Sequence, residues 1–304
     1  MFFFLKKLKY AFIIGIHKGR EKMLPKNYRP ISLTCHWSKV LEKVMRKDII
    51  EYLNDNDLWD VRQHGSRAGR STLSQLLAHQ DAIINAMENG SNMEVVYLDF
   101  AKAYDKVDHH LLLLRLREMG ITGNIGKWLG SFILERTQYV KVGDEISEGR
   151  QIMSGIPQGS VMVPILFIIF VQNMGLDTLS TNLDTLNTNL DTKKDEHDTK
   201  NTNAFIYVDD AKVLKEIKNE KDAMNFQEDL QKYYRWTDIN NMQFNNGKFV
   251  ALRYGKNELL KQDTLYFTNN WESPIDTLDS HRDLGVQMAS NGTFDCHIEE
   301  IIKK

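Results

Sequence analysis

Cysteine is nearly absent from the chain, and no apolar run is long enough to cross a bilayer. The two cysteines, Cys35 and Cys296, are far apart and fit neither a CxxC pair nor a Cys/His metal-ligand spacing. This excludes a disulfide framework and predicts a reduced, intracellular setting. Lysines interrupt the apolar residues 1–16, which are too short for a membrane span. We expect an edge strand or a truncated helix there, and no signal peptide.

An excess of charge of one sign is also lacking, because the formal net charge is only −2. The charges are unevenly distributed, however: residues 1–70 hold 15 Lys and Arg against 7 Asp and Glu. A basic first quarter followed by an acidic remainder fits a phosphate-facing lobe joined to a metal-binding lobe. A basic surface that binds no ligand is the alternative. The 304 residues, 42% of them apolar, are enough for one large or two modest cores.

Two acidic segments follow short apolar runs. Asp209 and Asp210 come after Phe205–Val208, and Asp99 comes after residues 94–98. Adjacent ionised carboxylates beside an apolar strand are unfavourable unless a cation neutralises them. Mg²⁺ prefers carboxylate oxygens and shares its coordination shell with phosphates. An Asp-Asp pair alone is more often a solvated turn, but two strands that deliver acids to one point are what two-metal phosphoryl transfer requires.

Seven short motifs occur in order along the chain. They are Asn27–Thr34, Gln63–Thr72, Leu98–Asp108, Ser154–Ser160, Tyr207–Asp210, Trp236 with Met242–Asn245 and Lys248, and Asp283–Val286. Together they resemble the reverse transcriptase domain of a non-LTR (LINE-type, jockey- or CR1-like) retrotransposon over nearly the whole chain. The residue sequence of the motif Leu98–Asp105 argues against another right-hand polymerase, such as a group II intron maturase.

The resemblance implies an RNA-directed DNA polymerase that adds deoxynucleotides to a primer 3′ end with two Mg²⁺ ions, or Mn²⁺. Catalysis and metal binding would fall to Asp99, Asp209 and Asp210. The nucleotide would be bound by Arg67, Tyr104, Gln158, Gly159 and Lys248, and the primer gripped by Leu284, Gly285 and Val286. Tyr104 would block a 2′ hydroxyl, although a core aromatic is the alternative, and Lys248 could equally be a surface lysine.

The same resemblance implies the partners: an RNA template, a DNA primer and deoxynucleoside triphosphates, with no membrane. The endonuclease and thumb of a full element would lie outside this chain. A decayed or captured fragment that folds, and binds RNA without polymerising, is the rival interpretation. The template, the oligomeric state and the compartment, nucleus or cytoplasmic ribonucleoprotein, stay open.

The implied fold is α/β (α+β) with right-hand polymerase architecture, its thumb absent or truncated. We expect fingers at 1–94, a palm with a fingers/palm hairpin at 95–175, and further palm with the start of a thumb connection at 203–304. Residues 176–202 between them contain three imperfect seven-residue repeats. Their Asp, Asn and Thr residues favour a low-complexity loop over a short heptad helix.

Periodicity and capping residues predict the individual elements. Helices are expected at 38–53, 71–87, 108–119, 160–174 and 222–240, and strands at 95–100, 138–142, 146–153, 249–254, 264–268 and 283–288. Two residues depart from the family's pattern. Ser66 replaces an aromatic residue, which could loosen the fingers, and Val163 replaces a glycine, which could crowd the following helix.

Overall fold

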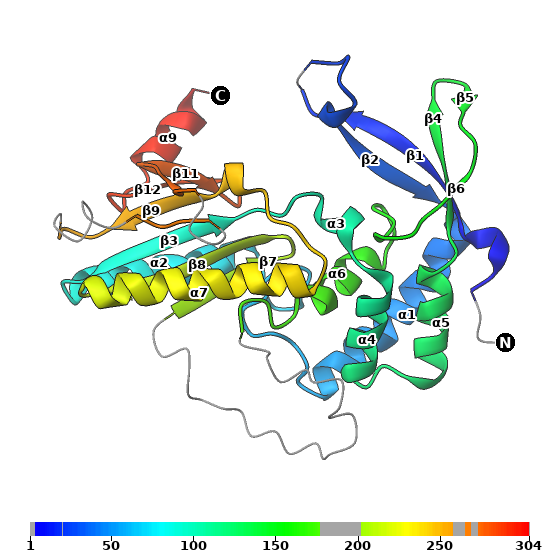
Figure 1. Cartoon of the computed structure of the whole chain (residues 1–304), viewed down its shortest axis with the longest axis horizontal. Coiled ribbons are helices and arrows are strands. Elements are labelled where there is room, and N and C mark those ends of the chain that lie inside the picture. Colours follow the sequence, from blue (N-terminus) through cyan, green and yellow to red (C-terminus); the bar gives the residue numbers. More distant parts are fainter. Residues whose placement is uncertain (1–3, 20, 177–201, 258–264, 269–272, 304) are drawn as a thin grey trace. The chain divides into compact units, whose positions relative to one another are not determined.

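The computed structural model describes residues 4–19, 21–176, 202–257, 265–268 and 273–303 (Figure 1). The chain forms two compact units. The first contains Met1–Asp60, Lys102–Gln172 and Asn240–Met242, and the second contains Val61–Ala101, Asn173–Ile239 and Gln243–Lys304. The low-complexity segment expected at 176–202 lies almost wholly outside the described residues. In the described part of the chain, no helix is long and apolar enough to span a membrane.

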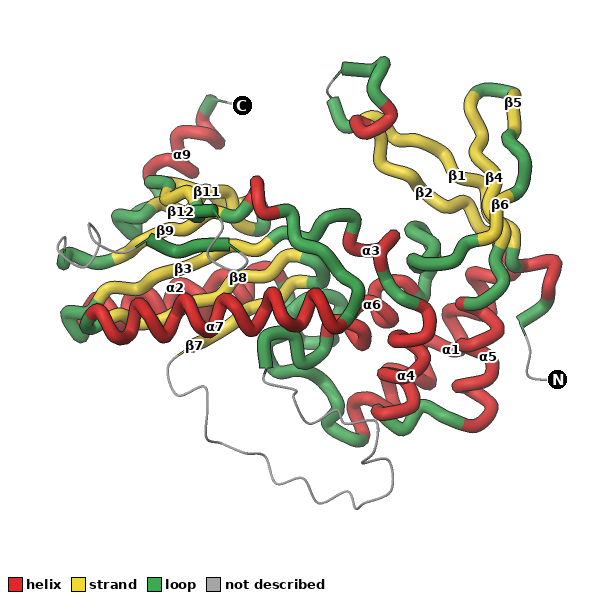
Figure 2. Tube along the Cα trace, in the orientation of Figure 1, coloured by secondary structure: helices red, strands yellow, loops and turns green. Residues whose placement is uncertain are grey.

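The first unit contains a five-stranded sheet (Figure 2). Strand β1 (Tyr10–His17) pairs antiparallel with β2 (Tyr28–Thr34) and parallel with β4 (Thr137–Val142), and β4 also pairs with β5 (Glu145–Ile146) and β6 (Arg150–Gln151). Residues 10–16 therefore lie in an interior strand and not in the expected edge strand, and a three-residue 3-10 helix at Lys6–Leu8 precedes it. The helices of this unit are η1 (Lys6–Leu8), η2 (Pro25–Asn27), α1 (His36–Asp55), α3 (Ala103–Lys106), α4 (His109–Glu118), α5 (Gly123–Ile133) and α6 (Val163–Val171).

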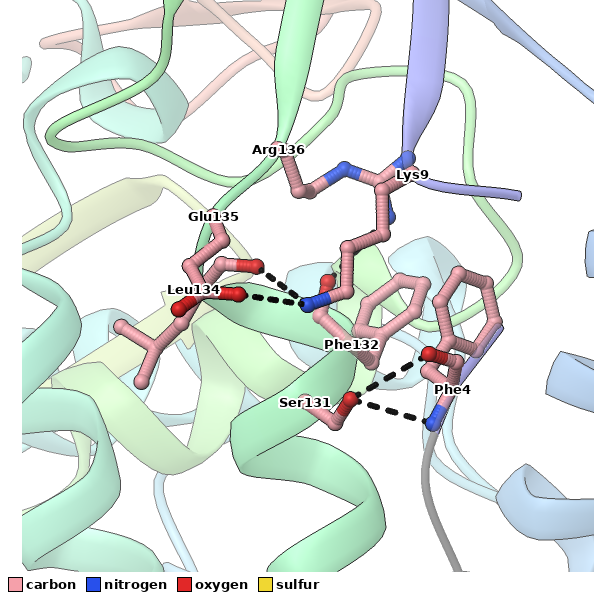
Figure 3. Close-up of polar contacts among 7 residues, drawn as sticks. All are labelled: Phe4, Lys9, Ser131, Phe132, Leu134, Glu135 and Arg136. Atoms are coloured by element: carbon pink, nitrogen blue, oxygen red, sulfur yellow. Dashed lines mark hydrogen bonds and ion pairs between the residues drawn. The ribbon is translucent and has the colours of Figure 1, made fainter. Parts of the chain in front are cut away.

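A buried arginine joins the start of the chain to the end of α5 (Figure 3). Arg136 is 1% exposed. Its Nη1 donates to the Phe132 carbonyl at 3.1 Å, and its guanidinium lies over the rings of Phe132 and Phe4. Burial lowers the pKa of Arg136 to about 10, and the Glu42 carboxylate opposes that shift. Nearby, Lys9 Nζ donates to the Leu134 carbonyl at 3.1 Å. These contacts fix the chain entering β1 against α5.

A buried carboxylate orders the residues before α6. Glu42 of α1 is 0% exposed. Its oxygens accept hydrogen bonds from Ser38 Oγ, Ser160 Oγ, and the backbone N–H groups of Val161 and Met162. A carboxylate at a helix N-terminus satisfies amides that have no partner within the helix. Helix α6 consequently begins at Val163, later than the predicted 160, because residues 160–162 form this cap.

Glu42→Ala should lower the free energy of unfolding by about 3–5 kcal/mol, because several buried donors would lose their acceptor at once. Urea denaturation followed by circular dichroism would measure the change. Glu51→Ala is the matched control on the same helix, since Glu51 is exposed and forms only a surface ion pair with Lys47. That variant should change the free energy by less than about 0.5 kcal/mol. Equal unfolding midpoints for the two variants would contradict the assigned role of Glu42.

The second unit is built on an antiparallel sheet with one short parallel strand. Its strand order is β10-β9-β3-β8-β7, and a separate hairpin pairs β11 with β12. The strands are β3 (Asn92–Leu98), β7 (Thr202–Tyr207), β8 (Asp210–Ile217), β9 (Val250–Tyr254), β10 (Asp276–Thr277), β11 (Ser280–Asp283) and β12 (Val286–Ala289). The helices are α2 (Thr72–Glu88), α7 (Glu220–Ile239), η3 (Asn246–Lys248) and α9 (Asp295–Ile302).

Helices α2 and α7 cover opposite faces of this sheet (Figure 1). One face packs Val95, Tyr97 and Leu214 against Ile83 of α2, with Met288 of β12 in the same cluster. Helix α7 buries Phe226, Leu230, Tyr233, Tyr234 and Trp236. These side chains therefore belong to the core of the second unit. Alternating strand residues thus serve two apolar interfaces, which fits a sheet covered on both sides.

The predicted helices are present, and their capping residues behave as expected. Ser71 and Ser74 form a reciprocal capping box at the start of α2, and Asp108 accepts from the amides of His110 and Leu111 at the start of α4. The strand expected at 264–268 is absent among the described residues 265–268, where Phe267 forms only an isolated bridge to Pro274. The expected second hairpin strand, 146–153, is divided into β5 and β6. The strand expected at 283–288 is interrupted by a turn at Leu284–Gly285.

Candidate active site

The second unit brings the three predicted catalytic acids to one end of its sheet. Leu98, the last residue of β3, pairs with Ala211 of β8, so Asp99 follows at the level of Asp210. Tyr207 of β7 pairs with Asp210, which leaves Val208 and Asp209 as the two-residue turn between β7 and β8. The antiparallel register therefore gathers acids that are more than 100 positions apart in sequence. This juxtaposition agrees with the expectation that two strands deliver carboxylates to a common point.

Two residues of the Gln63–Thr72 motif, Gln63 and Gly65, hold the β7–β8 turn. Val208 has φ +60°, an unusual conformation for a β-branched residue. Gln63 Oε1 accepts from the amides of Val208 at 3.0 Å and Gly65 at 2.7 Å. A Cβ on Gly65 would lie 2.8 Å from the Val208 nitrogen, so only glycine allows this approach. Gln63 and Gly65 thus support the turn that carries Asp209, and only their place in a fingers-like motif could have drawn attention to them.

The carboxylates influence one another electrostatically. Partial burial raises the pKa of Asp210 to about 6, with added repulsion from Asp209, Asp99 and Asp283, while Lys248 acts in the opposite direction. Lys248 Nζ lies 2.9 Å from Asp99 Oδ2. Lys248, which was expected to bind the nucleotide, is thus an ion-pair partner of an acid at this site. Across the described residues, no group of three or more His, Cys, Asp or Glu side chains is arranged so that it could hold a metal ion.

A small cavity adjoins these acids. It has a volume of about 150 Å³, and its lining includes Asp99, Asp210 and Lys248 together with Leu284 of the expected primer grip. Leu284 and Gly285 form the turn of the β11–β12 hairpin, with φ values of +46° and +92°. Val286 is the first residue of β12. Of the three residues of the predicted primer grip, Leu284 therefore lines the same cavity as Asp99 and Asp210.

Arg67 and its neighbour Arg70 precede α2. Arg70 Nη1 lies 2.9 Å from His64 Nε2, and His64 Nδ1 lies 3.1 Å from Ser74 Oγ. Burial lowers the pKa of His64 to about 4, and the cations Arg70, Lys212 and Arg67 add to the effect. The neutral imidazole therefore accepts from Arg70. Ser66, which departs from the family's pattern, lies in the loop between His64 and Arg67, where it is exposed and has φ +50°.

The other predicted nucleotide-binding residues belong to the first unit. The half-buried Tyr104 ring lies 4.9 Å from the Phe167 ring of α6. The carbonyl of Gln158 accepts from the Ser32 amide at 2.6 Å. Gly159 has φ +114°, and a Cβ there would lie 2.8 Å from the Ser32 carbonyl oxygen. Val163, the second departure from the pattern, is buried at the start of α6.

Comparisons with known proteins agree with this arrangement. The sequence pattern described as "Reverse transcriptase (RNA-dependent DNA polymerase)" matches residues 16–282. The chain is 26% identical, over 98% of its length, to the probable RNA-directed DNA polymerase from transposon X-element of Drosophila melanogaster. It is 29% identical, over 83% of its length, to the RNA-directed DNA polymerase from mobile element jockey of the same species. It spans 31% and 26% of those two proteins, less than a third of their length.

Solved structures show the same fold at low sequence identity. An apo telomerase from Candida tropicalis, truncated from its C-terminal domain, is 11% identical with a TM-score of 0.61, covering 95% of this chain and 55% of that one. Telomerase from Candida albicans in complex with a fragment of telomeric RNA gives a TM-score of 0.60 at 11% identity, covering 95% of this chain and 47% of that one.

Proposed function

The chain belongs to the reverse transcriptase (RNA-dependent DNA polymerase) family, and from this premise we propose that it adds deoxynucleotides to the 3′ end of a DNA primer on an RNA template. Its sequence relatives are polymerases of non-LTR mobile elements, so we assign it to the polymerase of such an element. The observation that carries the proposal is the convergence of Asp99 with Asp209 of the β7–β8 turn and Asp210 of β8 at one end of the sheet. An intracellular setting belongs to the same proposal, because its substrates would be RNA and deoxynucleoside triphosphates.

Within this proposal the second unit contributes the part of the palm that carries the three acids. We divide the chain by expected function into fingers at 1–94 and palm at 95–175 and 203–304. This division is supported by the basic residues of the first quarter, which suit a phosphate backbone. The second unit's sheet carries the acids, and its separate β11–β12 hairpin carries the primer-grip turn, as a palm requires. The endonuclease and thumb would belong to the part of the relatives' length that this chain does not span.

A divalent cation fits the chemistry of the site. Asp99, Asp209 and Asp210 would hold two Mg²⁺ ions, or Mn²⁺, because carboxylate oxygens are their preferred ligands and the repulsion that raises the pKa of Asp210 would be relieved. The bound ions would lower the pKa of the attacking hydroxyl and stabilise charge on the leaving pyrophosphate. The side chains would have to rearrange on binding, since the described residues contain no ready-made ligand group. Lys248 would leave Asp99 and turn toward the triphosphate.

The remaining residues would position the substrates. Arg67 would neutralise the triphosphate, as a guanidinium does well. Gln158 would contact the incoming nucleotide, and Gly159 would allow a close approach of the backbone. Leu284, Gly285 and Val286 would hold the primer beside the acids. Primer extension on poly-rA/oligo-dT with Mg²⁺ tests the whole proposal, and failure of the folded chain to extend would favour the decayed-fragment interpretation.

Metal binding can be tested without activity. Mg²⁺ at ten times its dissociation constant should stabilise the folded chain by about 1.4 kcal/mol, since it binds only the folded state. Thermal denaturation with and without Mg²⁺ would measure the shift. Asp209→Asn should lose most of it, whereas Asp144→Asn, in the exposed β4–β5 turn, should keep it. An equal Mg²⁺ response in both variants would argue against the acids as ligands.

A further inference from the structure

A buried ion pair joins the sheet of the second unit to the β11–β12 hairpin. The Lys212 ammonium bonds to Asp283 Oδ2, and the two side chains are 2% and 7% exposed. His79 of α2 completes the group, with Nδ1 3.3 Å from Lys212 Nζ and 3.5 Å from Asp283 Oδ2. Burial lowers the pKa of His79, which favours its neutral ring, and burial also lowers the pKa of Lys212, a shift that the Asp283 carboxylate opposes.

The lysine occupies a position where an apolar residue would be expected. Lys212 pairs with Tyr97 on β3 and with Phe205 on β7, so aromatic residues flank it on both sides. Replacing a buried ion pair with well-packed apolar groups is often neutral or stabilising, so such a pair is weak evidence for stability. A fixed electrostatic partner can instead select one arrangement of the elements it joins. The pair is better explained by what it positions.

The pair lies between the primer-grip turn and the acids. Asp283 pairs with Val286 and so begins the turn Leu284–Gly285, whose two positive φ values are those of a type I′ hairpin turn. Lys212 is two residues beyond Asp210 on the same face of β8, which places their Cα atoms about 6–7 Å apart. Asp283, Leu284, Lys212 and Asp210 all line the cavity of about 150 Å³.

We propose that the Lys212–Asp283 ion pair is a positioning element that fixes the turn Leu284–Gly285 relative to the acids and thereby places the primer 3′ end. An apolar contact in its place would let the hairpin shift along the sheet, whereas the ion pair has one favoured geometry. The inference rests on the proposed function, because it assigns the primer to this turn. It assigns a positioning role to two further residues, Lys212 and Asp283, neither of which would contact the reacting atoms.

The test removes both charges together. Lys212→Met combined with Asp283→Leu keeps side-chain volume and leaves no unpaired buried charge. The neutral His79 ring loses its two partners, so the melting temperature should fall by no more than a few degrees. Three quantities are then measured. They are the dissociation constant of a fluorescent RNA–DNA primer–template, by anisotropy without nucleotide, and the separate KM values for primer–template and for dTTP. The dissociation constant and the primer–template KM should rise about tenfold or more, with the dTTP KM within about twofold, because only the primer is misplaced.

A matched control lies on the same strand. Lys215 Nζ and Asp229 Oδ2 are 2.8 Å apart, and these side chains are 9% and 16% exposed. Lys215 is on the opposite face of β8, so Lys215→Met with Asp229→Leu removes a similar pair far from the turn. This control should keep the parental primer–template dissociation constant. If both double variants weaken primer binding equally, the positioning role is wrong.

Lys212→Met combined with Asp283→Asn provides a second variant, should the first double substitution melt early. It keeps the shape of the Asp283 side chain and an amide partner for His79, leaves no unpaired buried charge, and should raise the primer–template dissociation constant in the same direction. Parental primer binding in both Asp283 variants, with the fold intact, would overturn the inference. A parental chain that binds primer–template but does not extend it would overturn the proposed function alone, and the anisotropy comparison would still decide the inference.

Discussion

Asp209→Asn is expected to lower the rate of primer extension by at least a hundredfold, a rise of about 2.7 kcal/mol in the activation barrier. The amide keeps the shape of the side chain, but it removes the negative charge that two-metal catalysis needs. Asp209 lies in the β7–β8 turn, which Gln63 holds through the Val208 amide. The substitution leaves that support intact, so the loss should arise from chemistry and not from unfolding.

The stability of the same variant separates these explanations. Because Asp209 contributes to the raised pKa of Asp210, its neutralisation relieves repulsion between like charges. The melting temperature without metal should therefore be unchanged or slightly higher. Asp144→Asn serves as the control for loss of one surface carboxylate and should extend primers at the parental rate. If Asp209→Asn kept more than about a tenth of the parental rate, a loss under ~1.4 kcal/mol, the catalytic assignment would be wrong.

Local signals were sufficient for much of the fold. Ser71 and Asp108 cap the predicted helices because capping depends only on residues within one turn. Helix α5 was not predicted, because Gly123, Gly126 and Gly130 disfavour a helix. Its stability comes from distant contacts: the Phe4 ring lies 5.5 Å from Trp128 and 5.2 Å from Phe132 of α5. Tertiary packing of this kind overrides propensity and cannot be found in a local window.

The candidate site likewise has one part that local sequence signals predicted and another part that depends on distant contacts. Apolar runs ending in acids predicted Asp99, Asp209 and Asp210 as a group, and the sheet register places them at one end. Their roles remain predictions. The contacts that surround them join residues distant in sequence, such as Gln63 with Val208 and Lys212 with Asp283. No spacing rule connects such positions, so these supporting residues emerged only from the structure.

Tyr104→Val is expected to raise ribonucleotide incorporation by one to two orders of magnitude, roughly 1.4–2.8 kcal/mol, with a smaller effect on deoxynucleotides. The proposed reason is steric: the Tyr104 ring would lie under the incoming sugar and collide with a 2′ hydroxyl. Such discrimination penalises the wrong substrate and leaves the right one unaffected. The Tyr104 side chain is half-buried, with its ring 4.9 Å from Phe167, so part of it is available to a ligand.

Single-nucleotide kinetics with rGTP and dGTP would measure both rates for the parental chain and the variant. Tyr139→Val is a suitable control, since Tyr139 is a half-buried aromatic on β4 of the same unit. It should leave the ratio of the two rates unchanged. Removing the contact with Phe167 should lower stability by only about 0.5–1.5 kcal/mol beyond the loss of buried area. If Tyr104→Val lost both activities together and also melted early, Tyr104 would be a core aromatic, and sugar discrimination would have to reside elsewhere.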